Sequence, residues 1–283
     1  MVITRKGENP MPHVDDNGVK LWYRVKGNGE PLVLSGGFGL LHNQFDYVVD
    51  ILAKEFQVID WHYRGAGESD RAWVGGYPLD RWVDDLEVIL NHLNVSNAHL
   101  WGTSTGAPLS IRYVARYPHR VKSLITYPSF KAGVASRKMF QVFLDITEVF
   151  GYEALARFTA WIGCADQNVF SQVGNDIAIF EAEAFKRNFS VESLAKTLEV
   201  FTQIDLTSDL EKITVPTLIL LGDSGKLGGK AAPIIDAVRV FRMHCPHSQV
   251  VQIKDGGGTY CMIEKPQESA QAVSAFIKSL SRI

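Results

Sequence analysis

A serine between two glycines is the feature of this chain best placed to do chemistry. Residues 102–106 read GTSTG, with Ser104 at the centre, after an apolar run at 98–101 and before a segment of helical spacing. Strand, G-x-S-x-G and helix in this order predict a nucleophile elbow, a sharp turn that exposes the serine hydroxyl at the edge of a sheet. The glycines permit such a turn because they carry no Cβ. We therefore expect Ser104 to be catalytic.

Apolar, β-rich runs alternate with helical patterns along most of the chain. The strand-like runs cover residues 19–25, 31–34, 56–61, 97–101, 121–127, 216–221 and 249–253. The helical patterns between them cover residues 43–55, 79–93, 105–117, 231–243 and 264–279. Strands that alternate with helices indicate a parallel sheet covered on both faces. The expected fold class is α/β, with a mostly parallel sheet.

The alternation stops between residues 129 and 209. This stretch contains only helical patterns, at 140–150, 153–162, 176–188 and 193–201. Helices inserted between two strands of such a sheet are expected to cover the carboxyl ends of the strands as a cap. The expected domains are therefore a core of residues 1–128 and 210–283, and a helical cap of residues 129–209.

Five segments in this order resemble the capped, serine-nucleophile type of the α/β-hydrolase family. Besides the elbow they are 34–39 (LSGGFG), at the place of the oxyanion loop; 62–69 (HYRGAGES), at the place of D-x-R-G-x-G-x-S; 215–222 (VPTLILLG), before the catalytic acid; and 255–266 (DGGGTYCMIEKP), around the catalytic histidine. The resemblance covers essentially the whole chain. It implies an α/β-hydrolase fold with a helical cap.

The resemblance also implies an oxyanion hole. In this family two backbone N–H groups hold the oxyanion, and by position they belong here to Phe38 and Thr105. Gly37, in the same loop, and Tyr127 and Tyr260 are expected to bind substrate, although aromatic packing is the commoner explanation of the two tyrosines. Aimed N–H donors stabilise a developing oxyanion or enolate whether or not a serine attacks.

The proton-handling residues that the resemblance implies are replaced in this chain. A serine hydroxyl needs a base, and that base needs an orienting carboxylate. The histidine position, counted back from Glu264, holds Thr259, and the acid position holds Gly225. Threonine cannot accept a proton at neutral pH, and glycine has no side chain. We therefore expect a degenerate triad.

Two of the eight histidines fall near the elbow on this fold. His42 follows the oxyanion loop, and His62 stands at the aspartate position of the 62–69 turn, where we expect it to hydrogen-bond within the turn. A structural role is the commoner outcome for either residue. His42 is nevertheless the first candidate for a substitute base, so it is the second expected catalytic residue.

A loop of glycines and lysines, 225–230 (GKLGGK), stands where the acid is expected and precedes a helix. It lacks the first glycine and the Ser/Thr of a phosphate loop. A helix start with lysines still suits a carboxylate or phosphate group. A solvated, flexible loop is the commoner explanation of the same residues.

Composition narrows the class of protein. The chain has 283 residues, 46% of them hydrophobic, and a formal net charge of −2, which suits one α/β domain with an insertion and favours neither nucleic acid nor an anionic membrane as partner. No apolar run approaches the ~20 residues that span a bilayer, and residues 1–13 lack a signal-peptide core. Three scattered cysteines predict neither a disulfide framework nor a metal site. We expect a cytoplasmic protein with a small-molecule substrate and no metal or organic cofactor; the sequence does not indicate an oligomeric state.

Three functions stay open at this point. The first, which we favour, is an enzyme that acts on a small carbonyl compound through Ser104 and the oxyanion hole, with chemistry that is atypical because the triad is degenerate. The second is a conventional serine esterase or lactonase with a substitute base. The third is a catalytically silent homologue that binds a ligand or partner under its cap. An intact elbow favours the first over the third, because a binding pocket does not require a strained serine turn.

Overall fold

A computed structural model describes residues 12–71 and 79–281 of the chain. The prediction that residues 1–13 lack a signal-peptide core concerns a segment of which residues 1–11 lie outside the described residues. Within the described ranges the elements follow one another as the alternation predicts, with α/β order on both sides of a purely helical stretch.

The centre of the molecule is an eight-stranded sheet in the order β1-β2-β4-β3-β5-β6-β7-β8. The first two strands pair antiparallel with their neighbours, and all pairs from β4 to β8 are parallel. The predicted α/β class with a mostly parallel sheet is confirmed, and β1 is a strand that the sequence patterns missed. The strands are β1 His13–Asp16, β2 Val19–Lys26, β3 Glu30–Ser35, β4 Phe56–Trp61, β5 Ala98–Gly102, β6 Val121–Thr126, β7 Thr217–Ser224 and β8 Gln249–Gly257.

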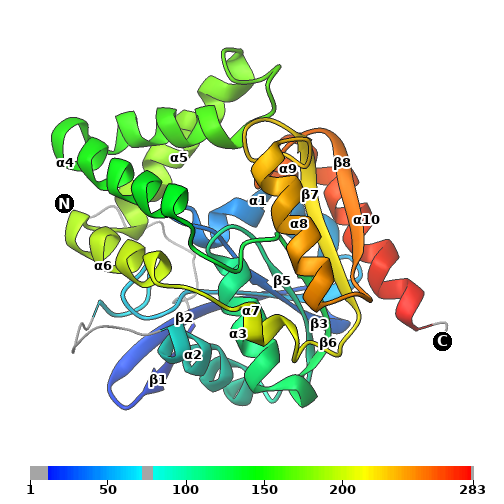
Figure 1. Cartoon of the computed structure of the whole chain (residues 1–283). Coiled ribbons are helices and arrows are strands. Elements are labelled where there is room, and N and C mark those ends of the chain that lie inside the picture. The colour runs from blue at the N-terminus through cyan, green and yellow to red at the C-terminus, as the bar shows by residue number, and fades with distance from the viewer. Residues whose placement is uncertain (1–11, 72–78, 282–283) are drawn as a thin grey trace.

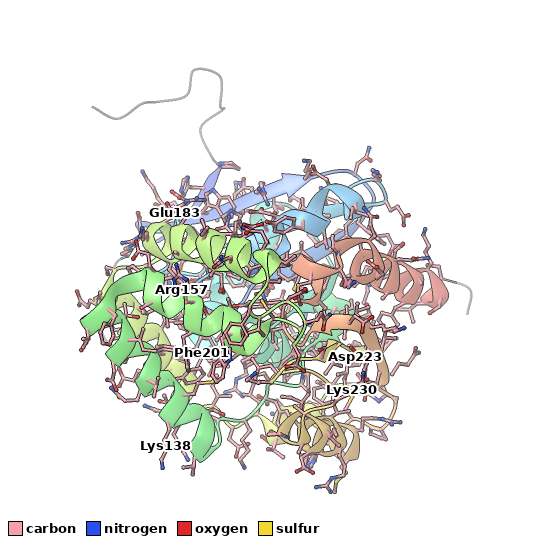
Figure 2. The ribbon with its side chains drawn as sticks, turned by 90° about the horizontal axis from the view of Figure 1, so that it is seen from above. Lys138, Arg157, Glu183, Phe201, Asp223 and Lys230 are labelled. Carbon is pink, nitrogen blue, oxygen red and sulfur yellow. The ribbon has the colours of Figure 1, made fainter. Side chains whose placement is uncertain are left out.

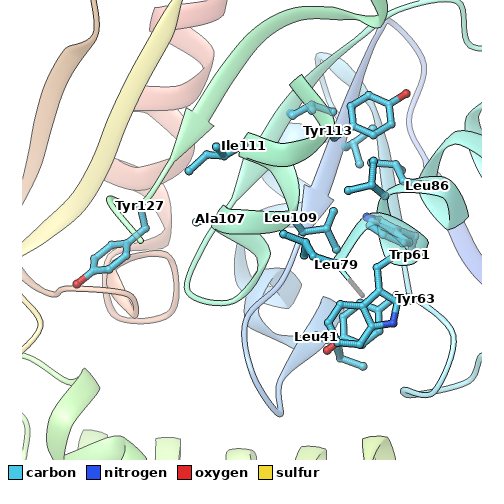
Figure 3. Close-up of a cluster of buried hydrophobic side chains, with 14 of the residues drawn as sticks. Leu41, Trp61, Tyr63, Leu79, Leu86, Ala107, Leu109, Ile111, Tyr113 and Tyr127 are labelled. Carbon is cyan, nitrogen blue, oxygen red and sulfur yellow. The ribbon is translucent and has the colours of Figure 1, made fainter. Parts of the chain in front are cut away.

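Both faces of the sheet are buried, since neighbouring side chains of the central strands enter two different hydrophobic cores. Leu32 and Leu34 of β3 belong to one core and Val33 to the other. Successive side chains of a strand point to opposite faces, so a strand covered on both sides reads as a continuous apolar run. Figure 3 shows part of the core that contains Val33, where α3 (Gly106–Arg116) carries Leu109 and Tyr113 toward side chains of α2 (Leu79–His92).

Helices cover the two faces in separate groups (Figure 1). One face packs against α1 Asp46–Leu52, α9 Cys261–Glu264 and α10 Pro266–Leu280. The other packs against α2 Leu79–His92, α3 Gly106–Arg116, α7 Thr207–Leu210 and α8 Ala232–His244. Two short 3₁₀ helices, η1 Leu41–Phe45 and η2 Pro118–Arg120, complete the core; η1 precedes α1 where the sequence predicted a single helix over residues 43–55.

Three long helices lie between β6 and β7 and gather beside the sheet in Figure 1: α4 Val134–Gly163, α5 Gln172–Asn188 and α6 Val191–Thr202. The backbone breaks helical geometry at Gly151, so α4 consists of two helices joined at a kink. The segment that leads from β6 into these helices pairs with the segment that follows α6: Ala132 N–H donates to Ile204 C=O and Leu206 N–H to Phe130 C=O, each at 2.8 Å. These contacts lie inside the predicted boundaries 129 and 209, and the division into two domains stays a prediction. None of the described helices is both long and apolar enough to cross a bilayer.

Candidate active site

Ser104 occupies a strained turn between β5 and α3. Its φ angle is +51°, in the left-handed region that residues with a Cβ rarely adopt. The turn is possible because Gly106 lets the chain pass closely over β3: a Cβ on Gly106 would lie 1.9 Å from the Ser35 carbonyl oxygen. This local geometry is that of a nucleophile elbow.

Two backbone N–H groups beside Ser104 are without an intramolecular acceptor. Among the described residues, none accepts a hydrogen bond from the N–H of Phe38 or of Thr105. Thr105 immediately precedes α3, so its N–H also stands at the positive end of that helix. The neighbouring Gly37 N–H is already used, because it donates to Gln44 Oε1 at 2.6 Å. Phe38 and Thr105 thus have the free donors that an oxyanion hole requires.

A cavity of about 550 Å³ opens above Ser104, between the core and the helices α4 to α6. The core contributes Phe38, Ser104, Thr105, Tyr127, Thr259 and Tyr260 to its lining. The inserted helices contribute mainly apolar side chains, among them Phe140, Phe143 and Phe201 (Figure 2 labels Phe201). A concave, mostly apolar site with a few polar groups is typical of small-molecule binding.

Comparison with known proteins assigns this architecture. Residues 30–160 match the family model of the alpha/beta hydrolase fold. A putative carbamate hydrolase RutD from Pantoea ananatis is 26% identical over 251 residues, 84% of this chain and 86% of the relative. A cis-3-alkyl-4-alkyloxetan-2-one decarboxylase from Shewanella oneidensis is 27% identical over 265 residues, 85% of this chain and 80% of the relative. A solved structure from the carboxylesterases of the thaumarchaeon Nitrososphaera gargenis has a TM-score of 0.81 at 22% identity and covers 96% of this chain and 99% of its own. The chain has the alpha/beta hydrolase fold.

The position at which an α/β hydrolase is expected to carry its histidine holds Thr259, which lines the cavity together with Ser104. Among the described residues, none forms a hydrogen bond with Ser104 Oγ. The buried side chain of Gln44, which the sequence analysis did not single out, accepts from Gly37 N–H and donates from Nε2 to the Thr259 carbonyl at 2.7 Å. Gln44 therefore ties the oxyanion loop to the segment around Thr259.

The position of the α/β-hydrolase acid holds Gly225, and its surroundings leave no room for a side chain. Its φ angle is +82°, and a Cβ would lie 2.3 Å from the Cys164 carbonyl oxygen. The nearby Asp223 is engaged elsewhere, because it accepts from Asp255 N–H at 2.8 Å and pairs with Lys230 at 2.6 Å (Figure 2). This hydrogen bond with Lys230 holds the pKa of Asp223 below its usual value. Asp223 is not among the residues that line the cavity.

His42, the expected substitute base, is buried and lies against His62. It is not among the described lining residues, and its Nδ1 lies 2.7 Å from His62 Nε2. Burial lowers the pKa of His42 to about 4 and that of His62 well below its usual value. His62 Nδ1 accepts from Glu68 N–H within the turn, as the sequence predicted. His62 is thus a hydrogen-bond partner of His42, and the role of His42 as a substitute base stays a prediction.

Some of the other residues expected to bind substrate line the cavity, and some do not. Tyr127 and Tyr260 both line the cavity, and Tyr127 is anchored because its hydroxyl donates to the Leu227 carbonyl at 2.8 Å. Gly37 lies against Ser104 without lining the cavity. In the loop 225–230, Lys226 lines the cavity and stands over the Trp161 ring at 4.6 Å, whereas Lys230 is paired with Asp223. Roles in substrate binding stay predictions for all of them.

One polar cluster in the cavity was missed by the sequence analysis. Glu181 of α5 is 1% exposed; its Oε1 accepts from the Tyr260 hydroxyl, and its Oε2 lies 3.0 Å from Thr159 Oγ1. Burial raises the pKa of Glu181 to about 8. The spacing of Ile177, Glu181 and Phe185 places the carboxyl on the buried face of its helix, and this was the signal that could have found it.

The described residues include no group of three or more His, Cys, Asp or Glu side chains arranged to hold a metal ion. The three cysteines, Cys164, Cys245 and Cys261, are buried and form no disulfide.

Proposed function

We propose that the chain is an α/β-hydrolase-fold enzyme that acts on a small carbonyl compound: an ester, a lactone, a thioester or a C–C bond next to a carbonyl group. Ser104 and the Phe38 and Thr105 amides would receive the substrate carbonyl. The observation that carries the proposal is the pair of N–H groups without an acceptor beside Ser104, on a cavity whose lining has Thr259 in place of a base.

The degenerate triad sets the kind of chemistry. One donor of an oxyanion hole is worth on the order of 10²–10³ in kcat, and it acts without any proton transfer from serine. A serine hydrolase without its triad still retains about 10³-fold catalysis over water. The site therefore suits reactions that need a polarised carbonyl more than an activated serine, such as decarboxylation, C–C cleavage, cyclisation or slow ester hydrolysis.

The relatives support this range of reactions. One carries the name of a carbamate hydrolase and another that of a decarboxylase, so the same fold at similar identity serves both bond hydrolysis and loss of carbon dioxide. The substrate is proposed to be a small, largely apolar molecule, because apolar side chains, several of them aromatic, predominate in the cavity walls. The proposal includes no metal, organic cofactor, nucleic acid or membrane.

The test is turnover of short-chain p-nitrophenyl esters, lactones and β-keto acids, run beside labelling with a fluorophosphonate. We expect slow turnover of at least one class and little covalent labelling of Ser104. Fast turnover with stoichiometric labelling would instead identify a conventional serine esterase with a substitute base. Stabilisation by a ligand without any turnover would identify a silent binding protein.

A further inference from the structure

We propose that Glu181, together with Tyr260, is the proton donor of this active site and takes over the proton transfer that histidine performs in other α/β hydrolases. The inference rests on the proposed function and names the residues that move the proton. It begins from the contents of the cavity, which contains a buried carboxyl group from α5 facing a hydroxyl from the segment that also bears Thr259.

The chemistry of the lining singles out this carboxyl group. The ionisable side chains among the described lining residues are Tyr127, Lys131, Glu181, Lys226 and Tyr260. Burial raises the pKa of both tyrosines, and Lys131 is paired with Asp205 at 2.6 Å. Burial raises the pKa of the Glu181 carboxyl group to about 8, which is close to neutrality. A general acid works best when its pKa is close to the working pH.

The hydrogen bonds of Glu181 accommodate both of its protonation states. The Tyr260 hydroxyl donates to Oε1. Thr159 Oγ1 lies 3.0 Å from Oε2 and 3.1 Å from the carbonyl oxygens of Leu155 and Ala156. When the threonine proton goes to a helix carbonyl, its lone pair can accept the proton of a carboxylic acid; when it turns to Oε2, it stabilises a carboxylate. The carboxyl group can therefore lose and regain a proton without leaving a buried atom unpaired.

The groups around Glu181 favour the acid form at neutral pH. Thr159 belongs to α4, Cys164 directly follows that helix, and Tyr260 belongs to the segment between β8 and α9. Burial raises the pKa of Cys164 and of Tyr260, so both neighbours are neutral. Lys226 also lines the cavity, and among the described residues it has no ion-pair partner; its ammonium group faces the Trp161 ring.

In the proposed step the oxygen of a water molecule bonds to the carbonyl carbon of the substrate, and the π electron pair of the carbonyl group goes to its oxygen. The carbonyl group then forms again, the bond from its carbon to the leaving atom breaks, and the electron pair of that bond goes to the leaving atom. That atom takes the proton of the Glu181 carboxylic acid, which is left as a carboxylate. The amides of Phe38 and Thr105 hold the negative charge on the carbonyl oxygen before the bond breaks. The water molecule consumed in the hydrolysis returns the proton to Glu181.

The test compares wild type with Glu181→Gln on the substrate that the wild type turns over. Glutamine accepts from Tyr260 and donates to Thr159, so it reproduces the contacts of the neutral acid but has no proton to give. We expect kcat to fall about 100-fold. Wild-type kcat/KM should decline as pH rises through about 8, where the acid form is lost, and this decline should be absent in Glu181→Gln. Glu183→Gln, on the exposed side of the same helix, is the matched control and should behave as wild type (Figure 2).

A second variant gives a result that a purely structural role would not produce. The Tyr260 hydrogen bond lowers the pKa of Glu181, so Tyr260→Phe should move the alkaline decline to higher pH. The assignment would be overturned if Glu181→Gln kept the wild-type kcat and the same decline of kcat/KM at alkaline pH. If Glu181→Gln does not fold, the assignment is overturned when kcat/KM of Tyr260→Phe declines at the same pH as that of wild type. Absence of any wild-type turnover would remove the proposed function itself, whereas turnover that is indifferent to Glu181 removes only this inference.

Discussion

At the scale of single residues, the proposed function separates charge stabilisation from proton transfer. Ser104, Phe38 and Thr105 line one cavity, and Thr259, at the position expected to hold a base, lines the same cavity. Strain at Ser104 is retained, with φ at +51°, although no described side chain hydrogen-bonds to its hydroxyl. Retained strain indicates that the position of the serine matters to function.

Replacing Thr259 by histidine tests whether the low reactivity expected of Ser104 is due to the missing base. A positioned base contributes about 10²–10⁴ in rate, and Gly225 supplies no carboxylate to orient it, so we expect the lower end of that range. Thr259→His should raise the rate of fluorophosphonate labelling of Ser104 by about 100-fold, measured by intact mass. Thr259→Asn changes the side-chain size in a similar way without adding a base, and equal labelling of the two variants would contradict the interpretation.

Gln44 is the residue whose loss should cost the site most stability. Gln44→Leu leaves the Gly37 N–H and the Thr259 carbonyl without their buried partner, and each unpaired group costs roughly 1–3 kcal/mol. We expect the free energy of unfolding in urea to fall by about 2–4 kcal/mol. The exposed Gln141, whose amide contacts Asp145, offers the control: Gln141→Leu should change stability by less than about 0.5 kcal/mol.

At the scale of elements, the cap depends on a break inside α4. Gly151 has φ +81° and ψ −178°, a conformation that is essentially restricted to glycine, and the nearest atom to an added Cβ is 3.6 Å away. The cost of Gly151→Ala is therefore backbone strain without a clash, about 1–3 kcal/mol by urea denaturation. Gly133, just before α4, has φ −79° and open space around it, so Gly133→Ala should be neutral or slightly stabilising. Equal changes in the free energy of unfolding for the two variants would contradict the expected backbone strain at position 151.

The contact between α5 and the core should make stability depend on pH through Glu181. Its pKa is about 8 in the folded chain and near 4.5 when unfolded, so between these values the unfolded chain binds fewer protons than the folded one. Stability contributed by Glu181 is then complete below pH 4.5 and falls as pH rises toward 8, by an amount on the order of several kcal/mol. The difference in unfolding free energy between wild type and Glu181→Gln, measured in urea from pH 5 to 8, should follow this fall. A constant difference would mean that Glu181 does not titrate in that range.

At the scale of the whole molecule, the fold was predictable because its signals are repeated along the chain. Buried strands such as β3 and β5 read as apolar runs, and the helical stretch between β6 and β7 stood out by the absence of such runs. The elbow was predictable because glycine spacing determines a local turn. Two sets of hydrogen bonds were not predictable: that of Gln44 with the Thr259 carbonyl, and those of Glu181 with Thr159 and Tyr260. Each joins segments far apart in the chain whose proximity depends on tertiary packing. The contact between His42 and His62 was not predictable for the same reason, since the two residues lie 20 positions apart along the chain.

The most direct test of the central claim is the ratio of kcat/KM for Ser104→Ala to that of wild type on the best carbonyl substrate found. If the oxyanion hole and not an activated serine provides the catalysis, Ser104→Ala should retain about a tenth or more of the wild-type value. A loss of about 10⁴-fold or more would show that Ser104 is a working nucleophile with its own base, and the account of this site given above would be wrong.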